Sequence, residues 1–311
     1  MEIRIIDLFA GIGGIRLGFE RAARGFGHSI KCVFSSEIDK YARKTYATNF
    51  GEEPAGDITQ IAADDIPDFD VLCGGFPCQA FSVAGRRLGF KDTRGTLFFE
   101  IARLIDAKKP KAFLLENVKG LVTHNKGKTL ATILSVLRDD LGYYVPEPKV
   151  LNARNFGVPQ QRERIIIVGF RKDVCSGSFT FPRGTSPSSL EDIILDDVDQ
   201  KYFLSDKYVA MLERHRRLQA AKGNCFGFCV VDREGVANAL MVGGMGKERN
   251  LIYDGSRLRF LTPREWARLQ GFDDSFVIPV SDTQAYRQFG NSVAIPMIAE
   301  VATQIIVKLE R

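Results

Sequence analysis

The sequence contains few of the residues that define several common protein classes. It has six cysteines, three histidines and one tryptophan in 311 residues. The cysteines are sparse, and two of them lie inside apolar runs, so we expect free thiols and a reducing compartment and not a disulfide framework. Cys225 and Cys229 lie close together, but no second pair with the spacing of zinc ligands follows. The sequence therefore predicts no metal site.

Long apolar runs, internal repeats and low-complexity tracts are also missing. No stretch approaches the unbroken apolar length of a membrane span, and the N-terminus lacks the pattern of a signal peptide. The composition, 45% hydrophobic and 26% charged, is that of an ordinary globular protein. We therefore expect a cytoplasmic protein without membrane contact, with one large domain or a large domain and a small companion.

The positive charge is concentrated in one part of the chain. The formal net charge is +5, and residues 201–259 contain eleven Lys or Arg against six Asp or Glu, which accounts for the whole surplus. A basic segment of this kind favours binding of a polyanion, although solvated charge on a helix surface is the commoner explanation.

The N-terminal residues predict the first unit of a doubly wound sheet. An Ile-rich strand, residues 3–8, leads directly into a glycine-rich turn and then into a helix. Glycines allow a ligand to approach the backbone closely, and Glu37 at the end of the second strand is placed to bind ribose hydroxyls. The glycine spacing is not G-x-G-x-x-G, which weakens an interpretation as an NAD site.

Chemically versatile side chains follow several predicted strands at the point where each strand ends. Cys78 comes after a short buried strand and a Phe-Pro step, which makes it a candidate nucleophile, although many free cysteines are inert core residues. Asp7, Glu37 and Glu116 also lie at strand ends. The carboxyl ends of parallel strands share one edge of the sheet, and ligands bind at that edge.

The second half of the chain is less regular. A Ser-, Gly-, Thr- and Pro-rich stretch, residues 179–189, marks a domain boundary. Beyond it we expect a helix over 206–221, short irregular runs and a flexible basic loop over 243–250. Regular structure resumes with Pro263 at the first position of a helix. An apolar helix over 296–309 is expected to pack back on the first domain.

Taken together, the motifs resemble those of the DNA cytosine-5 methyltransferases of the compact bacterial type. The resemblance runs along nearly the whole chain in the order of the family, and it is thinnest from about 185 to 257. The matching motifs are Asp7-Leu8-Phe9-Ala10-Gly11-Ile12-Gly13-Gly14, Glu37, Asp57, Pro77-Cys78-Gln79, Glu116-Asn117-Val118, Gln161-Arg162-Glu163-Arg164, Leu261-Thr262-Pro263-Arg264-Glu265 and Gly290-Asn291-Ser292-Val293.

The resemblance implies an α/β fold with a doubly wound, Rossmann-like S-adenosylmethionine-dependent methyltransferase domain and a mixed, mostly parallel sheet. Residues 1–185 and 291–311 would form this catalytic domain. Residues 186–262 would form a small, irregular, mostly β target-recognition domain, and 263–290 a connecting hinge. The cofactor would be S-adenosylmethionine, with S-adenosylhomocysteine as the product. Its binding residues would be Phe9, Ala10, Gly11, Gly13, Gly14, Glu37, Ile38, Asp57, Ile58, Gly75, Pro77, Leu97, Asn291, Ser292 and Val293.

The resemblance also implies the catalytic and DNA-binding residues. Cys78 would add to the target cytosine, Glu116 would act at its N3, and Arg162 with Arg164 would form the paired-arginine motif. The DNA-binding residues would be Gln79, Ser82, Arg86, Arg94, Lys247 and Arg249. One position departs from the family pattern, because Ala239 precedes Leu240 where many members carry threonine.

The resulting expectation is a sequence-specific enzyme that methylates C5 of a flipped cytosine in double-stranded DNA. It would be a bacterial monomer in a restriction-modification system, with a cognate restriction endonuclease acting separately. One alternative is an RNA (tRNA) cytosine-5 methyltransferase on the same scaffold. A second is an NAD-dependent oxidoreductase, which leaves Cys78, Glu116 and Arg164 unexplained. A third is a non-catalytic DNA-binding module, which would predict substitutions in the chemical motifs, and there are none.

Overall fold

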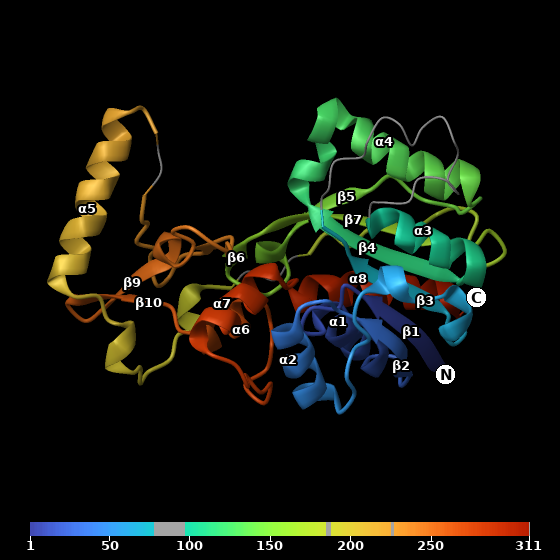
Figure 1. Cartoon of the computed structure of the whole chain (residues 1–311), viewed down its shortest axis with the longest axis horizontal. Helices are drawn as coiled ribbons and strands as arrows, with labels where there is room; N and C mark the ends of the chain where they lie inside the picture. Colours follow the sequence, from blue (N-terminus) through green and yellow to red (C-terminus); the bar gives the residue numbers. More distant parts are fainter. Residues whose placement is uncertain (78–96, 185–187, 225–226, 311) are drawn as a thin grey trace. The chain divides into compact units, whose positions relative to one another are not determined.

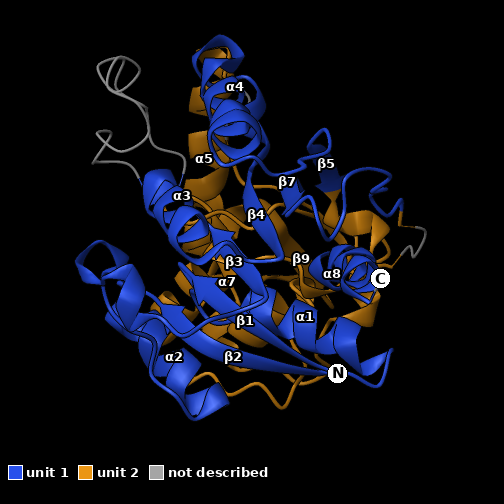
Figure 2. Cartoon of the chain, turned by 90° about the vertical axis from the view of Figure 1, so that its right-hand side faces the viewer, with its two compact units in different colours: residues 1–151, 163–183, 297–311 blue, residues 152–162, 184–296 orange. Residues whose placement is uncertain are grey.

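The computed structural model describes residues 1–77, 97–184, 188–224 and 227–310, and the chain divides into two compact units (Figures 1 and 2). Unit 1 comprises Met1–Leu151, Glu163–Arg183 and Met297–Arg311. Unit 2 comprises Asn152–Arg162 and Gly184–Pro296. The stretch expected as a hinge, 263–290, therefore belongs to unit 2.

Unit 1 contains a six-stranded sheet with the order β2-β1-β3-β4-β7-β5. The first four strands in this order are parallel, and β7 is antiparallel to β4. This mixed, mostly parallel sheet confirms the predicted Rossmann-like α/β fold. The strand order reverses between β1 and β3. In sheets of this kind, the ligand binds next to the carboxyl ends of the two strands between which the order reverses. The strands are β1 Glu2–Leu8, β2 Ser29–Ser36, β3 Val71–Gly75, β4 Ala112–Val118, β5 Lys149–Asn152 and β7 Glu163–Phe170.

Helices cover both faces of this sheet. Figure 2 shows α3 on one face, with α1 and α8 together on the other. Side chains of α3 and α4 pack with alternate residues of the strands, such as Phe113 and Leu115 of β4, in a common core. A Cβ atom on Gly18 would lie 2.5 Å from Ile298 Cγ2, so α1 and α8 are in close contact and the last helix packs on the first domain as predicted. The helices are α1 Gly14–Arg24, α2 Lys40–Phe50, α3 Leu97–Lys108, α4 Lys128–Ser135 and α8 Ile295–Leu309.

Two elements of unit 1 differ from their predicted bounds. The sequence pattern of residues 128–141 predicts one amphipathic helix, whereas this stretch consists of α4 followed by a π-helical turn, Val136–Asp140, so its last turn widens. The sequence also predicts a strand over residues 145–151, but only the end of this stretch belongs to a strand, β5. Neither difference changes the edge of the sheet at which the candidate site lies.

One helical stretch of the described residues, Asp282–Leu309, is long and apolar enough by length and composition to cross a membrane. This corrects the expectation that no stretch approaches that length. The stretch includes α7 and α8, and 61% of its most apolar window is buried inside the protein. Core helices of globular proteins meet the same criterion, so the stretch is weak evidence for a membrane span.

Unit 2 consists of short elements. Its longest helix is α5 Asp206–Ala221, which has the predicted bounds. This helix is also the longest element of residues 186–262, a segment that we expected to be mostly β. Helix α6 begins with a capping box and has Pro263 at the expected position. A small core of Leu204, Leu212, Phe228, Leu251 and Leu258 joins α5 to a hairpin. The other strands and α-helices are β6 Gln160–Gln161, β8 Ala237–Asn238, β9 Leu251–Asp254, β10 Arg257–Phe260, α6 Pro263–Leu269 and α7 Asp282–Asn291.

Candidate active site

The glycine turn after β1 is held by the carboxylate of Glu37. Glu37 Oε2 accepts a hydrogen bond from the N–H of Gly11 at 2.8 Å, and Oε1 accepts one from the N–H of Asp39 at 2.8 Å. Phe9, Gly11 and Gly13 have φ values of 54°, 56° and 84°. Left-handed backbone disfavours a side chain, and its presence at the non-glycine Phe9 is typical of functional loops. The turn and the end of β2 therefore form one rigid carboxylate-bearing loop.

Other residues expected at the cofactor lie around this loop with different exposure. Ile38, next to Glu37, is 74% exposed. Asp57 is half-buried and accepts a hydrogen bond from the N–H of Thr59 at 3.0 Å, which caps a short 3-10 helix. Ile58 is 2% exposed and belongs to the core. Ala10 and Gly14 are buried, Gly75 and Leu97 are half-buried, and Pro77 is exposed.

Asp7 is a buried acid at the end of β1. It is 1% exposed, and neither carboxylate oxygen has a hydrogen-bond partner in the part of the chain that the structure describes. Burial raises the pKa of this carboxyl well above its ordinary value, against the opposing charge of Arg16. Burial therefore favours the neutral form of Asp7 at the carboxyl end of β1.

The ends of β3 and β4 are joined next to the nucleophile motif. Asn117 Nδ2 donates a hydrogen bond to the carbonyl of Phe76 at 2.8 Å, and both residues are buried. This bond fixes the backbone directly before Pro77. Cys78 itself lies outside the described residues, as do the expected DNA-binding residues Gln79, Ser82, Arg86 and Arg94.

Glu116 and Arg164 form an ion pair on neighbouring strands. Arg164 Nε lies 2.8 Å from Glu116 Oε1, and their side chains are only 15% and 11% exposed. In the antiparallel ladder of β4 and β7, Arg164 is paired with Val118, which is two residues after Glu116 on β4. A Cβ atom on Gly75 would lie 3.5 Å from Glu116 Oε2, so the carboxylate reaches the end of β3. The structure thus brings together two of the four predicted catalytic residues.

Arg162 has different surroundings from Arg164. It belongs to unit 2, is 1% exposed, and donates hydrogen bonds to the main-chain carbonyls of Leu240, Gly290 and Ser292. The assignment of Arg162 to catalysis did not anticipate this internal role. The expected cofactor residues Asn291, Ser292 and Val293 also lie in unit 2, at the end of α7 and just beyond it. Asn291 is exposed, Ser292 is half-buried and Val293 is buried.

The basic loop over 243–250 is more ordered than expected. Residues Lys247–Asn250 form a 3-10 helix, and the side-chain amide of Asn250 accepts a hydrogen bond from the N–H of Asn238 and donates one to its carbonyl. Lys247 Nζ lies 4.8 Å from the ring centre of Phe260 and 5.3 Å from that of Tyr286, so cation–π contacts hold it. The Arg249 side chain is half-buried and forms no hydrogen bond or ion pair with other described residues.

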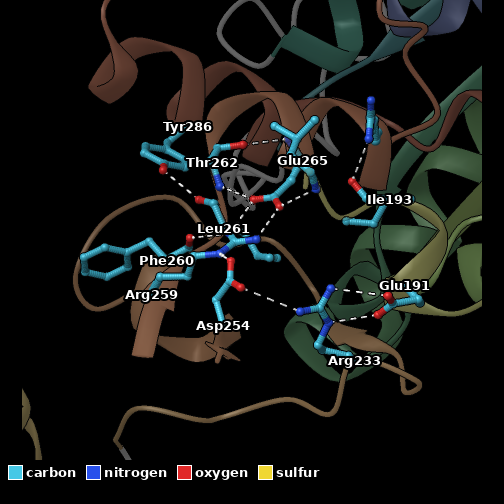
Figure 3. A network of polar contacts seen from close by, with 12 residues as sticks. Glu191, Ile193, Arg233, Asp254, Arg259, Phe260, Leu261, Thr262, Glu265 and Tyr286 are labelled. Atoms are coloured by element: carbon cyan, nitrogen blue, oxygen red, sulfur yellow. Dashed lines mark hydrogen bonds and ion pairs between the residues drawn. The ribbon is translucent and has the colours of Figure 1, made fainter. Parts of the chain in front are cut away.

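A buried ion network, which the sequence motifs did not predict, joins the β9–β10 hairpin to α6 (Figure 3). Arg259 and Glu265 have no exposed side-chain surface and form two hydrogen bonds of 2.9 Å. Arg259 Nε also contacts Asp254 at 2.7 Å, and Asp254 lies 3.8 Å from Arg233, which pairs with Glu191. Removing one partner of such a buried pair costs about 3–5 kcal/mol. The network therefore supports the fold of unit 2.

Four described cysteines are free thiols: Cys32, Cys73 and Cys175 are buried, and Cys229 is exposed. Burial raises the pKa of Cys32 to about 11 and that of Cys73 well above its ordinary value, so both are poor thiolates. No group of three or more His, Cys, Asp or Glu side chains within the described ranges could hold a metal ion.

Comparisons with known proteins identify the family. The sequence model of C-5 cytosine-specific DNA methylases matches residues 3–307. The chain is 52% identical over 329 residues to the Type II methyltransferase M.HpaII of Haemophilus parainfluenzae, covering 99% of this chain and 90% of the relative. It is 40% identical over 317 residues to the Type II methyltransferase M.HhaI of Haemophilus parahaemolyticus, covering 97% and 94%.

Solved structures share the fold at lower sequence identity. The Entamoeba histolytica methyltransferase EhMeth matches with a TM-score of 0.78 at 18% identity, covering 100% of each chain. A mutant of Spodoptera frugiperda DNMT2 matches with a TM-score of 0.74 at 22% identity, covering 99% of this chain and 100% of that one. With the family match over almost its whole length, this chain belongs to the C-5 cytosine-specific DNA methylases.

Proposed function

We propose that this DNA cytosine-5 methyltransferase modifies one cytosine within a specific duplex sequence, with Cys78 as nucleophile and with Glu116 and Arg164 acting on the target base. The observation that carries the proposal is the ion pair of Glu116 and Arg164 at the ligand edge of the sheet. The Asn117 bond to Phe76 holds the chain that leads to Cys78 at the end of the neighbouring strand. A nucleophile that follows β3 in the sequence, together with two polar groups on β4 and β7, can address three atoms of one flat ring.

The chemistry of cytosine explains why these residue types are needed. C5 of cytosine is a weak nucleophile, and addition of the Cys78 thiolate to C6 converts the ring into an enamine with a reactive C5. Negative charge develops on the ring in this step. A proton shared with N3 by Glu116, and the guanidinium of Arg164 at O2, would stabilise that charge. Arg164 would also favour the thiolate form of Cys78. After methyl transfer, loss of the C5 proton to water and cleavage of the S–C6 bond would return the Cys78 thiolate and release 5-methylcytosine.

The loop after β1 fits an adenosyl cofactor. The Glu37 carboxylate accepts hydrogen bonds from two N–H groups and has lone pairs left to accept two more from the ribose hydroxyls. Ile38 offers an exposed apolar surface. Gly11 has no atom within 4 Å of where a Cβ would lie, which leaves room for a ligand against the backbone. Asp57 would accept from the adenine amino group. S-adenosylmethionine supplies the electrophilic methyl group when bound.

We assign sequence recognition to residues 186–262, as a target-recognition domain within unit 2. Supporting observations are the concentrated positive charge and the absence of chemical motifs in this segment. Affinity from phosphate contacts carries no sequence information, so discrimination requires side chains or backbone at base edges. Arg249 is a better candidate base-reading residue than Lys247, because two aromatic rings already contact the Lys247 ammonium group.

DNA is favoured over RNA as the substrate by the relatives that are 40–52% identical, which are named as Type II methyltransferases. The fold alone does not make this distinction. The decisive experiment is to incubate the enzyme and S-adenosylmethionine with mixed-sequence duplex DNA and map 5-methylcytosine by bisulfite sequencing. We expect methylation confined to one short word, and parallel reactions with tRNA should give none. Methylation of tRNA but not of duplex DNA would overturn the proposal.

The relatives further favour a place in a bacterial restriction-modification system. In this proposal the enzyme works in the cytoplasm as a monomer on duplex DNA, and a separate endonuclease recognises the same word. Protection of genomic DNA from one restriction specificity, in cells that express this chain, would support the assignment. Mass measurement by light scattering, with and without a duplex, would test the monomer.

A further inference from the structure

Two buried polar side chains, those of Gln160 and Arg162, contact the backbone of Leu240 in unit 2, and the side chain of Gln270 contacts Gln160. Gln160 and Gln270 are 0% exposed, and Arg162 is 1% exposed. Gln160 Oε1 accepts a hydrogen bond from the N–H of Leu240 at 3.1 Å, and Arg162 Nη1 donates one to the carbonyl of Leu240 at 3.3 Å. Both main-chain groups of one residue are therefore bonded to side chains and not to a neighbouring strand.

The same side chains connect this residue to the ends of α6 and α7. Gln160 Nε2 donates to the side-chain oxygen of Gln270 at 3.2 Å and to the carbonyl of Leu269 at 2.9 Å. Arg162 and Gln270 both donate to carbonyls at the end of α7, and these carbonyls belong to Phe289, Gly290 and Ser292. We call Gln160, Arg162 and Gln270 the polar clamp. Gln160 bonds directly to Gln270, and Arg162 and Gln270 both donate to the carbonyl of Ser292.

The clamp lies directly before an exposed turn. Met241 and Val242 are 48% and 43% exposed, and they are followed by two exposed glycines. Gly243 and Gly244 have φ values of 84° and 53°, with no atom within 4 Å of where a Cβ would lie. The backbone of these glycines is open to a ligand, and their conformation excludes most other residues. The strand pair next to the clamp, β6 with β8, is only two residues long.

We propose that the polar clamp positions the exposed turn, residues 241–244, against the base edges of DNA, and that Gln160, Arg162 and Gln270 are thereby positioning residues for sequence discrimination. The inference rests on the proposed function. Two-residue strands supply few backbone bonds to fix the turn, so the hydrogen bonds at Leu240 must set its place. Hydrogen bonds weaken steeply with distance and angle, so a displaced turn loses its preference for one base pair. A mismatched base pair typically reduces binding by roughly 10- to 100-fold.

The experiment compares Arg162→Met and Gln270→Met with a matched control, Tyr286→Phe. The control also removes a buried donor in unit 2, the Tyr286 hydroxyl, which donates to the carbonyl of Leu261 at 2.7 Å, but it does not touch the clamp. For each protein, kcat/KM is measured on the recognised duplex and on duplexes with one base pair changed. Single-turnover rates at saturating duplex and thermal melting are measured alongside.

We expect the ratio of kcat/KM between recognised and changed duplexes to fall about tenfold at one position in both clamp variants. The single-turnover rate of Gln270→Met on the recognised duplex should stay within about threefold of wild type, because Gln270 does not touch the reacting atoms. Tyr286→Phe should leave the ratio unchanged at a comparable loss of melting temperature. Gln270 is outside every catalytic motif, so an effect there cannot come from lost base contact.

Two results would overturn the inference. One is an equal loss of rate on all duplexes with an unchanged ratio, which would indicate a catalytic or purely structural role. The other is the same change of ratio in Tyr286→Phe. If Arg162→Met does not fold, Gln270→Met and the conservative Arg162→Lys carry the test with the same criteria. A wild-type enzyme that methylates no DNA would instead refute the proposed function.

Discussion

The substitution Glu37→Gln separates two tasks that the structure gives to one carboxylate. Glu37 accepts the N–H groups of Gly11 and Asp39 through its two oxygens, each at 2.8 Å. An amide has one acceptor oxygen, so one N–H would lose its partner and face an NH₂ group. An unsatisfied buried donor costs about 1–3 kcal/mol, and we expect the lower end because Glu37 is only half-buried. Melting of the ligand-free protein should fall by roughly 2–4 °C for each kcal/mol.

The same change removes the charged acceptor that we assign to the ribose. Hydrogen bonds to charged groups contribute about 1.5–3 kcal/mol, and those between neutral groups about 1 kcal/mol. We therefore expect S-adenosylhomocysteine to bind more weakly by about 1–2 kcal/mol, which is roughly 5- to 30-fold in Kd. The methylation rate at saturating cofactor should remain within about threefold of wild type, because the ribose does not react.

Titration calorimetry with S-adenosylhomocysteine and thermal melting measure the two effects separately. Asp39→Asn is the matched control, because it makes the same carboxylate-to-amide change two residues away. Asp39 Oδ1 caps α2 by accepting from Tyr41 and Ala42, and asparagine caps helices equally well. Both measurements should therefore stay close to wild type in the control. A lower melting temperature in Glu37→Gln with unchanged affinity would refute our reasoning, since Glu37 would then only brace the loop.

The remaining predictions concern the other residues of the site and the recognition segment. Cys78→Ala should abolish methyl transfer but leave duplex affinity largely intact, because affinity comes mainly from phosphate contacts; wild type, but not this variant, should form a denaturation-resistant adduct with duplex containing 5-fluorocytosine. Glu116→Gln should lower turnover about 100- to 10,000-fold, and unchanged turnover would show that Glu116 serves only as the ion-pair partner of Arg164. Asp57→Ala should mainly weaken the binding of S-adenosylhomocysteine. Arg249→Ala should relax the choice at one base position if Arg249 reads a base, and a uniform loss with a shallower salt dependence would show a phosphate contact instead. Exchange of residues 185–259 for the segment of a relative should transfer the relative's recognition word; an active chimera that kept the original word would contradict the assignment of recognition.

The sheet edge was predictable because its signals are local. Strands β2 and β4 contain short apolar runs, and the polar residues Glu37 and Glu116 lie at their ends or directly after them in sequence. The order of apolar runs and polar residues is therefore enough to place Glu37 and Glu116 at one edge of the sheet. The bounds of β5 and of the helix after residue 128 were less well predicted, because irregular last turns depend on packing and not on local pattern.

The two arginines of the motif could not be separated from sequence. Arg162 and Arg164 are two residues apart, which in a continuous strand would place them on the same face. The chain turns instead, since the N–H of Arg162 donates to the carbonyl of Gln160 at 2.9 Å, the bond of a three-residue turn. The Arg162 side chain therefore lies in the interior of unit 2, whereas Arg164 is the second residue of β7 and pairs with Glu116.

Long-range polar partners were also invisible in the sequence. Gln160 and Gln270 are 110 residues apart and share no pattern that would indicate contact. The loop over 243–250 was expected to be flexible because of its glycines and charges. Buried Glu248, which accepts from the hydroxyl of Tyr208 at 2.8 Å, and the paired Asn250 and Asn238 order it.

Chemistry and discrimination thus depend on different kinds of support in this chain. Glu116 and Arg164 extend from strands of seven and eight residues within a continuous ladder, so their geometry follows from backbone pairing alone. The turn over 241–244 follows a two-residue strand, and its place depends on three buried side chains. A change in the turn itself alters exposed residues without removing any of these bonds. It follows that substitutions at Met241 or Val242 should change which duplex is methylated at little cost in stability, whereas substitutions in the clamp should affect both.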